Sequence, residues 1–154
     1  MKRIVEQDVE EACIDWLEEL GYQYFHGAEF SPDAESPERK YPSDVILVKH
    51  LRDALQRIND LPDDAIDTAI KKIVYPDTPN LLDNNHNFHQ MLTDGISVEF
   101  EQHGETKHDI VWPIDFENVE KNEFLVINQF TVIEKNERRP DVVLFVNGIP
   151  IVII

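Results

Sequence analysis

Apolar residues recur every three or four positions through much of the first hundred residues, the spacing of one face of an α-helix. The first such stretch ends at Gly21, a typical helix stop, and its opposite face carries acids. Its apolar positions, which we predict to face the core, are Val9, Cys13, Trp16, Leu17 and Leu20. Further helices are predicted over about 45–59, 63–74 and 80–92. A charged segment with three prolines, 31–43, is predicted to be a loop.

After Gly95 the pattern changes to the alternation of apolar and polar positions that is typical of β-strands. Strands over about 96–100 and 110–114 are predicted to form a hairpin, with Trp112 in the core. A further strand is predicted over 124–133.

Residues 142–146 and 149–154 are apolar at successive positions, which predicts two strands covered on both faces in the middle of a sheet. Asn147-Gly148 between them is a strong hairpin signal. Because helices mostly precede strands along the chain, the pattern predicts an α+β fold, with a mixed, mostly antiparallel central sheet flanked by helices.

The chain has 154 residues, with 14 Lys and Arg against 31 Asp and Glu, and its formal net charge is −17. This length predicts one domain spanning 1–154. Because phosphate contacts need basic residues, the charge argues against independent capture of nucleic acid. Cys13 is the one cysteine, so no intramolecular disulfide can form. No apolar run approaches the ~18 residues of a membrane span. We therefore expect a cytoplasmic protein with no membrane association.

Candidate chemistry lies where Arg138, Arg139 and Pro140 lead into Asp141, directly before the apolar strand 142–146. A carboxylate beside a buried strand is costly unless it is paired or holds a metal. One interpretation places Asp141 at an exposed strand end, where it accepts hydrogen bonds from either arginine. The other makes Asp141 a ligand of Mg²⁺, a hard cation that prefers oxygen ligands.

Nearly the whole chain resembles a known family, the N-terminal nuclease domain of the restriction (R) subunit of type I restriction-modification enzymes. That family is a branch of the PD-(D/E)xK nucleases. Four blocks carry the resemblance: 6–21 (EQDVEEACIDWLEELG), 81–89 (LLDNNHNFH), 122–132 (NEFLVINQFTV) and 139–150 (RPDVVLFVNGIP). The last block is the most specific of them.

The resemblance implies a PD-(D/E)xK core and Mg²⁺-dependent hydrolysis of double-stranded DNA, with Asp141 as a catalytic metal ligand. In the family the second hairpin strand ends in Glu-x-Lys, and this chain stops at Ile154 before that motif. We therefore expect a fragment of a larger, ATP-binding motor subunit, inactive as a nuclease by itself. The implied partners are the methyltransferase and specificity subunits of a bacterial or archaeal cytoplasmic complex, with only weak DNA binding by this domain alone.

A further metal ligand is expected from the first helix. In related nucleases a helix glutamate precedes a Gly-aromatic pair by eleven residues, and Glu10 has that spacing to Gly21-Tyr22. Glu10 is thus the second predicted catalytic residue and metal ligand, and Glu6, one turn earlier, is a weaker metal candidate. The alternative is that these are surface acids favoured near a helix N-terminus.

The hairpin also carries a geometric prediction. A two-residue loop at Asn147-Gly148 would pair Asp141 with Ile154 and turn the next position to the wrong face. We predict a three-residue loop, 146–148, with Gly148 left-handed in a bulge, which pairs Asp141 with Ile153. The position after Ile154 then shares the face of Asp141.

Other patterns were weighed against this site. Asp33 with Glu38-Arg39-Lys40, and Asp94 with Glu105-Thr106-Lys107, match the letters of the nuclease motif but are predicted to be solvated loops. His86 and His89 have helical spacing, and packing is favoured over metal binding. Asn122, Asn128 and Gln129 gave no physical ground for a role.

A rival function uses the same acidity. The −17 charge and the absent Glu-x-Lys would also suit a non-catalytic interaction module, or a DNA mimic whose carboxylates stand in for phosphates.

Overall fold

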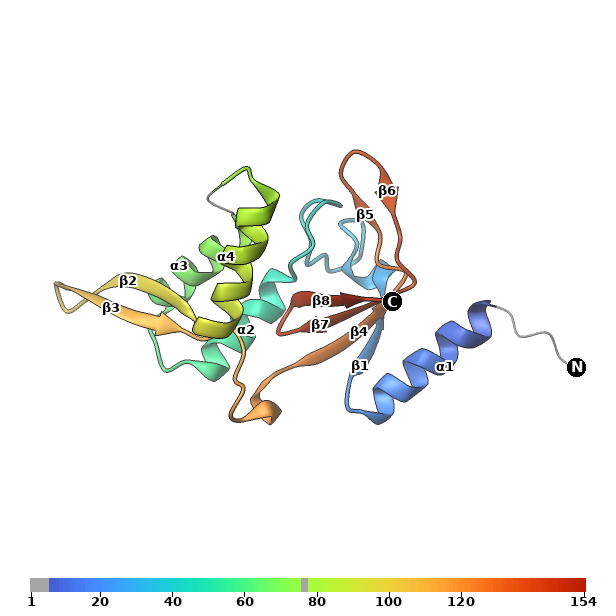
Figure 1. Ribbon diagram of the computed structural model, residues 1–154, viewed down its shortest axis with the longest axis horizontal. Coiled ribbons are helices and arrows are strands. Elements are labelled where there is room, and N and C mark those ends of the chain that lie inside the picture. Colours follow the sequence, from blue (N-terminus) through green and yellow to red (C-terminus); the bar gives the residue numbers. More distant parts are fainter. Residues whose placement is uncertain (1–5, 76–77) are drawn as a thin grey trace, which may run out of the picture. The chain divides into compact units, whose positions relative to one another are not determined.

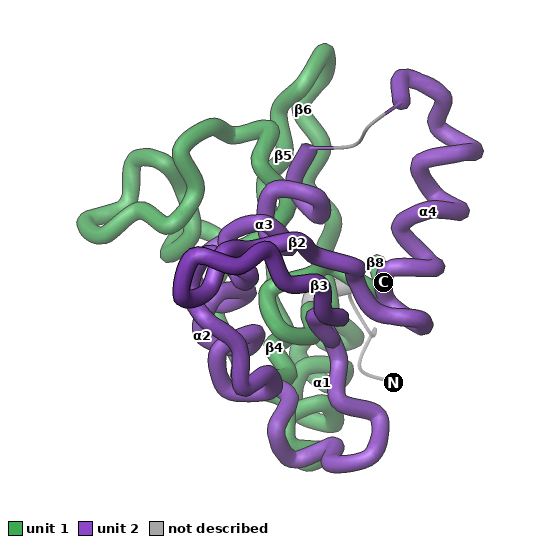
Figure 2. The backbone as a smooth tube through the Cα atoms, turned by 90° about the vertical axis from the view of Figure 1, so that its left-hand side faces the viewer, with its two compact units in different colours: residues 1–47, 123–154 green, residues 48–122 purple. Residues whose placement is uncertain are grey.

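The computed structural model describes residues 6–75 and 78–154, with side chains described from Asp8 onward. These residues form two compact units (Figure 2). Unit 1 joins the N-terminal part of the chain, up to Leu47, to Glu123–Ile154, and unit 2 is Val48–Asn122. The expectation of one domain over 1–154 stays a prediction.

Unit 1 is built on a four-stranded sheet in the order β1-β4-β7-β8. β1 runs parallel to β4, whereas the β4–β7 and β7–β8 pairs are antiparallel. α1 packs on β1 and β4 (Figure 1). The bounds in unit 1 are α1 Glu6–Glu19, β1 Gln23–His26, the 3₁₀ helix η1 Gly27–Phe30, β4 Phe124–Asn128, β5 Val132–Ile133, β6 Glu137–Arg138, β7 Val142–Val146 and β8 Ile149–Ile153. The predicted α+β class, with a mixed and mostly antiparallel sheet, is confirmed.

Both faces of β4 and β7 are buried. Towards α1, the sheet packs Val126, Val142 and Leu144 against Ile14, with Leu17 and Tyr22 at the edge. The other face forms a larger cluster made of Phe30, Leu47, Leu125, Ile127, Phe130, Val143 and Phe145. The prediction of a central strand is therefore confirmed for β7. It is wrong for β8, an edge strand whose Ile153 is 72% exposed.

The predicted helix at the N-terminus forms, but it presents a different face to the sheet. Trp16 is 68% exposed, and Val9 and Leu20 are exposed as well, so the predicted apolar stripe is wrong for these three residues and confirmed for Leu17. The residues that turn inward are Glu10, Ile14 and Leu17, at positions i, i+4 and i+7. This stripe lies next to the predicted one, and it carries a carboxylate along with the apolar contacts.

Unit 2 contains three helices and a hairpin, with α3 packed on β2. Its elements are α2 Val48–Ile58, α3 Asp63–Val74, α4 Leu81–Asp94, β2 Ile96–Gln102, β3 Glu105–Val111 and the 3₁₀ helix η2 Val119–Lys121. The predicted bounds of α3 are confirmed, and its inward residues are Ala65, Ile66, Ala69, Ile70 and Ile73.

The predicted core position of Trp112 is wrong, because the inward residue at the end of β3 is Val111 and the Trp112 ring is 41% exposed. Instead, the backbone of Trp112 exchanges two hydrogen bonds with the buried side chain of Asn59, at 2.7 and 2.9 Å. These hydrogen bonds from Asn59 hold the segment in place, whereas the sequence predicted that packing of the indole ring would do so.

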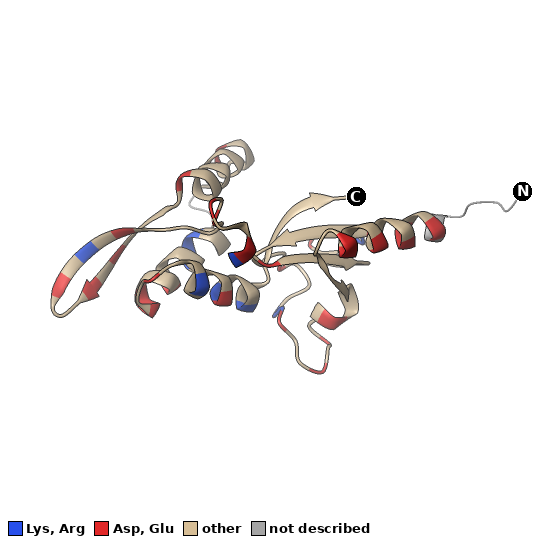
Figure 3. Ribbon diagram, turned by 90° about the horizontal axis from the view of Figure 1, so that it is seen from below, with Lys and Arg blue, Asp and Glu red and all other residues tan. Residues whose placement is uncertain are grey.

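Acidic residues recur along α1 in unit 1, whereas α2 and α3 of unit 2 carry both acidic and basic residues (Figure 3). Across the described residues, no helix combines the length and apolar character that crossing a membrane requires.

Candidate metal centre

Asp141 lies where β4 ends and β7 begins. Asn128, the last residue of β4, pairs with Val142, the first residue of β7. The next residue, Gln129, donates its backbone N–H to the backbone carbonyl of Asp141 at 3.0 Å. The side chain of Asp141 is exposed at this strand end.

Gln129 interrupts the strand predicted over 124–133 and carries the central contacts of the site. Its φ is 52°, in the left-handed region that residues other than glycine rarely adopt. In this conformation its side-chain nitrogen Nε2 lies 3.4 Å from Asp141 Oδ1, and 3.4 Å from each carboxylate oxygen of Glu10. Because carboxylate oxygens only accept, the NH₂ end of the amide faces both acids.

Gly27 makes room for this turn of the backbone. A Cβ at Gly27 would lie 2.5 Å from the carbonyl oxygen of Gln129 and 2.8 Å from that of Asn128. Such contacts are far inside van der Waals distance, so η1 can cross Gln129 this closely only because residue 27 is glycine.

Glu10 reaches the site from the sheet-facing side of α1, where it is half-buried. Asn128 Nδ2 donates to Glu10 Oε1 at 2.9 Å, and Tyr24 Oη donates to Asn128 Oδ1 at 3.1 Å. The carboxylate of Glu10 is thus oriented by a chain of side chains from two neighbouring strands.

The structure brings together two of the three predicted metal ligands, since Glu10 and Asp141 meet on the amide of Gln129. The side chain of Glu6 lies outside the described part of the chain. Among described residues, no group of three or more His, Cys, Asp or Glu side chains could hold a metal. The two carboxylates therefore fit a hard cation in kind, but supply only part of its coordination shell, because Asn128 and Gln129 turn their amide NH₂ groups towards the acids.

The predicted three-residue hairpin loop is wrong. Val146 pairs with Ile149, so the turn has two residues, and both have left-handed φ: 53° at Asn147 and 77° at Gly148. Buried Asn147 suits the turn because its backbone N–H and side-chain Oδ1 bond the main chain of Glu123, at 2.9 and 2.8 Å.

The bulge lies within β8 and not at the turn, so Ile153 pairs with Val143 and not, as predicted, with Asp141. Phe145 pairs with Pro150 but Leu144 pairs with Val152, so Ile151 is the extra residue of β8. Val142 and Ile154 then exchange backbone hydrogen bonds of 3.3 and 2.9 Å. The position directly opposite Asp141 is therefore the one that would follow Ile154.

The rival interpretation of Asp141, as the partner of a neighbouring arginine, is not what the structure has. Across the described residues, no ion pair or hydrogen bond joins Asp141 to Arg138 or Arg139, and both arginines are exposed.

Arg39 departs from the predicted solvated loop, because it is only 3% exposed. Its guanidinium donates to the carbonyls of Asp44 at 2.6 Å, Thr131 at 2.8 Å and Pro42, and lies 4.3 Å above the ring of Phe130. Burial lowers the pKa of Arg39, and the charge of Asp44 partly opposes this. Arg39 therefore fixes the long loop to the segment that follows Gln129.

The other secondary candidates stay at the surface. Lys107 and Glu105 belong to exposed β3 rather than to a loop, and His86 and His89 are exposed on α4, so their predicted packing is wrong. The sequence provided no reason to assign Gln129 to the site, because the apolar pattern predicts neither its left-handed backbone conformation nor the contact of its side chain with Glu10.

Known proteins are similar to this chain over nearly its whole length. The family model described as type I restriction enzyme R protein N terminus matches residues 3–154. A putative type I restriction enzyme MjaIXP endonuclease subunit of Methanocaldococcus jannaschii is 43% identical over 150 residues, covering 94% of this chain and 14% of that protein. The type I restriction enzyme HindI endonuclease subunit of Haemophilus influenzae is 34% identical over 151 residues, covering 96% and 14%.

A second Methanocaldococcus jannaschii protein, the putative type I restriction enzyme MjaVIIIP endonuclease subunit, is 29% identical over 155 residues. This chain spans about one seventh of the length of these relatives, 13 to 14% in each case. The match to the family model covers nearly every residue, and two relatives exceed 30% identity. The chain therefore belongs to the family of type I restriction enzyme R protein N-terminal domains.

Proposed function

We propose that this chain is the nuclease domain of a type I restriction enzyme R subunit and contributes to Mg²⁺-dependent hydrolysis of phosphodiester bonds of double-stranded DNA in the larger subunit, while being inactive by itself. The observation that carries the proposal is the meeting of Glu10 and Asp141 on the side-chain amide of Gln129. Two negative carboxylates that lie close to the same amide nitrogen repel each other, and a shared cation would offset that repulsion.

Glu10 and Asp141 would hold the cation, and Gln129 and Asn128 would orient the two carboxylates. When bound, Mg²⁺ supplies a Lewis acid that polarises a phosphoryl oxygen and favours a hydroxide nucleophile at neutral pH. In the register of the hairpin, a residue that continued β8 beyond Ile154 would lie opposite Asp141. The family's second carboxylate is expected at that position. We infer that Glu-x-Lys occupies the next positions of the complete subunit.

The rest of the subunit would supply ATP-driven translocation, and methyltransferase and specificity subunits would supply recognition of the DNA. A net charge of −17 is compatible with this proposal, because other parts of the enzyme would bind the DNA and the nuclease domain would not need to capture it by itself. Compared with the alternative of a DNA mimic, the hydrogen-bonding of Glu10 and Asp141, from two distant elements, to the same Gln129 amide favours a built site over an acidic surface.

The test is DNA cleavage by the complete subunit assembled with its partners. Asp141→Asn and Glu10→Gln each remove one negative charge from the site, and we expect each to lower the cleavage rate by more than about 100-fold, beyond the effect typical of an outer-shell residue. Glu18→Gln is the matched control, because it removes the same charge from the exposed side of α1. Cleavage that survives Asp141→Asn would overturn the proposal.

A further inference from the structure

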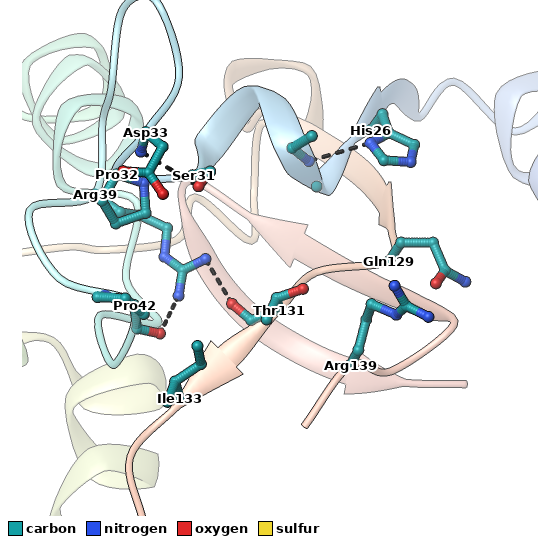
Figure 4. A pocket seen from close by; sticks show the side chains of 12 residues that line it. His26, Ser31, Pro32, Asp33, Arg39, Pro42, Gln129, Thr131, Ile133 and Arg139 are labelled. Atoms are coloured by element: carbon teal, nitrogen blue, oxygen red, sulfur yellow. Dashed lines mark hydrogen bonds between the residues drawn. The ribbon is translucent and has the colours of Figure 1, made fainter. Parts of the chain in front are cut away.

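Gln129 also forms part of the wall of a cleft in unit 1. The cleft has a volume of about 490 Å³, and η1, the loop that follows it and the segment after β4 surround it. The side chains of His26, Gln129 and Arg139 follow one another along one side, across from Arg39 (Figure 4). The candidate metal centre and the cleft therefore share one residue.

Arg139 supplies the available positive charge of the cleft. Its guanidinium points towards Gln129 (Figure 4), and it has no hydrogen bond or ion pair within the described part of the chain. The other arginine, Arg39, is already bound to three backbone carbonyls. Asp33 is the acid of the lining and stands on the side of Arg39, away from Arg139.

His26 supplies a second donor whose direction is fixed. Its Nδ1 accepts the backbone N–H of Ala28 at 3.1 Å, and its own backbone N–H donates to Glu29 at 2.8 Å. Because Nδ1 is an acceptor here, the proton of the neutral imidazole is on Nε2. The ring therefore presents an N–H donor on the same side of the cleft as Arg139.

We propose that this cleft binds a phosphate group of a DNA strand, next to the phosphodiester bond served by Glu10 and Asp141, with Arg139 as its main ligand and His26 as the second. The proposal rests on the proposed function. A guanidinium matches the geometry of phosphate oxygens with two parallel donors, and it is the common ligand where such recognition is needed. A second phosphate contact would position the DNA strand so that the phosphodiester bond to be cleaved lies at the metal centre. Contacts to the DNA backbone generally fix position and orientation in this way.

A DNA strand is favoured over a free phosphate or nucleotide by the position of the cleft. Gln129 lines the cleft and also contacts Glu10 and Asp141. A ligand that reaches from the cleft to these carboxylates must therefore be longer than one phosphate. Single phosphate groups are commonly bound by successive backbone N–H groups of a glycine-rich loop, whereas Arg139 and His26 are separate side chains on one wall.

The test is a titration of the chain with a short DNA duplex in low salt, followed by NMR shifts of backbone amides. Arg139→Gln is compared with Arg138→Gln, because Arg138 is exposed and adjacent but does not line the cleft. We expect Arg139→Gln to weaken binding about three- to tenfold and to reduce the slope against log salt by about one phosphate contact. We expect Arg138→Gln to change affinity less than about twofold. Equal effects of the two variants overturn the proposal.

Two further arms assign the ligand. Single phosphates of the duplex are replaced in turn by uncharged methylphosphonates. At one position the replacement should abolish the difference in affinity between wild type and Arg139→Gln. If the difference persists at every position, the proposal is overturned. Inorganic phosphate and a deoxynucleoside monophosphate should bind at least about tenfold more weakly than the duplex. Equal affinity would assign the cleft to a small anion and overturn the DNA assignment.

Failure of this proposal is separable from failure of the nuclease assignment. Duplex binding is measured without a divalent cation, which cleavage requires, so the comparison of wild type with Arg139→Gln does not depend on Glu10 or Asp141 holding a metal. His26→Asn keeps an acceptor for the Ala28 N–H and removes the Nε2 donor, so it should weaken binding without unfolding η1. If cleavage depends on Asp141 but duplex binding ignores Arg139, only the cleft proposal falls.

Discussion

Gln129 and Asp141 are joined twice, through a backbone hydrogen bond of 3.0 Å and a side-chain contact of 3.4 Å. The first fixes the strand end that bears the carboxylate, and the second fixes the carboxylate itself. Because the same amide also contacts Glu10, the spacing of the two acids depends on one residue in a left-handed conformation.

Removing the amide of Gln129 should therefore loosen the metal centre without unfolding the domain. For Gln129→Gly we expect divalent-cation affinity to fall about 10- to 100-fold, the range typical of residues that orient metal ligands. Calorimetric titration with Mn²⁺ measures it. Glycine keeps the φ of 52° without strain, so the free energy of unfolding should be equal to or higher than that of wild type. An unchanged affinity would contradict the orienting role.

Gly27→Ala tests the close approach of η1 to Gln129. The new Cβ would lie 2.5 Å from a backbone oxygen that cannot rotate away, so we expect a loss of about 1–3 kcal/mol in the free energy of unfolding. Urea denaturation measures this. Gly104→Ala is the control, because its φ is 78° but its Cβ would meet open space, and it should leave the amide shifts of Gln129 unchanged. Gly27→Ala should move those shifts, and coincident spectra would contradict the geometry.

Arg39→Ala should destabilise unit 1, because three backbone carbonyls would lose a buried charged donor. The expected loss is about 2–4 kcal/mol in the free energy of unfolding. The neighbouring Lys40 is exposed and stacks on Tyr41 at 5.2 Å, so Lys40→Ala should cost less than about 1 kcal/mol. Similar losses for the two variants would mean that Arg39 belongs to a solvated loop after all.

Asp115 carries a pH dependence in unit 2. Backbone N–H groups of Asn118 and Glu117 donate to its Oδ1 at 2.8 and 3.1 Å, and these bonds, that of Asn118 foremost, hold the pKa of Asp115 below its usual range. A depressed pKa in the folded state contributes stability above the unfolded value of about 3.9, and this contribution is lost as the pH falls through the folded pKa. Asp115→Asn should be less stable than wild type at pH 7, and the gap should shrink below about pH 4 in urea denaturation. A gap that does not change with pH would contradict this.

Sequence reasoning reached the fold class because periodicity reports the elements directly, as in α3 and in β7. It failed where one face had to be chosen: Trp16 was assigned to the core and is exposed, while Glu10 on the adjacent stripe faces the sheet. The apolar pattern alone cannot predict that a glutamate faces the sheet while a tryptophan faces solvent. The carboxylate of Glu10 is stabilised by Asn128 and Gln129, which are far away in the sequence.

The site residues themselves were predicted in part. The position of Asp141 follows from the strand after it, but the predicted pairing of Asp141 with Ile153 is wrong, because the bulge lies at Ile151 and Ile153 pairs with Val143. Bulges depend on pairing across strands and leave no local signal, which is also why Gln129 and Gly27 were missed.

The central claim is that Glu10 and Asp141 share one divalent cation. Paramagnetic broadening by Mn²⁺, added below one equivalent to the labelled chain, tests it most directly, since it detects weak binding residue by residue. We expect the amides of Asn128, Gln129 and Asp141 to broaden first, and Asp141→Asn to abolish this while Glu18→Gln does not. Broadening that begins on the exposed acids of α1, or that persists in Asp141→Asn, would contradict the claim.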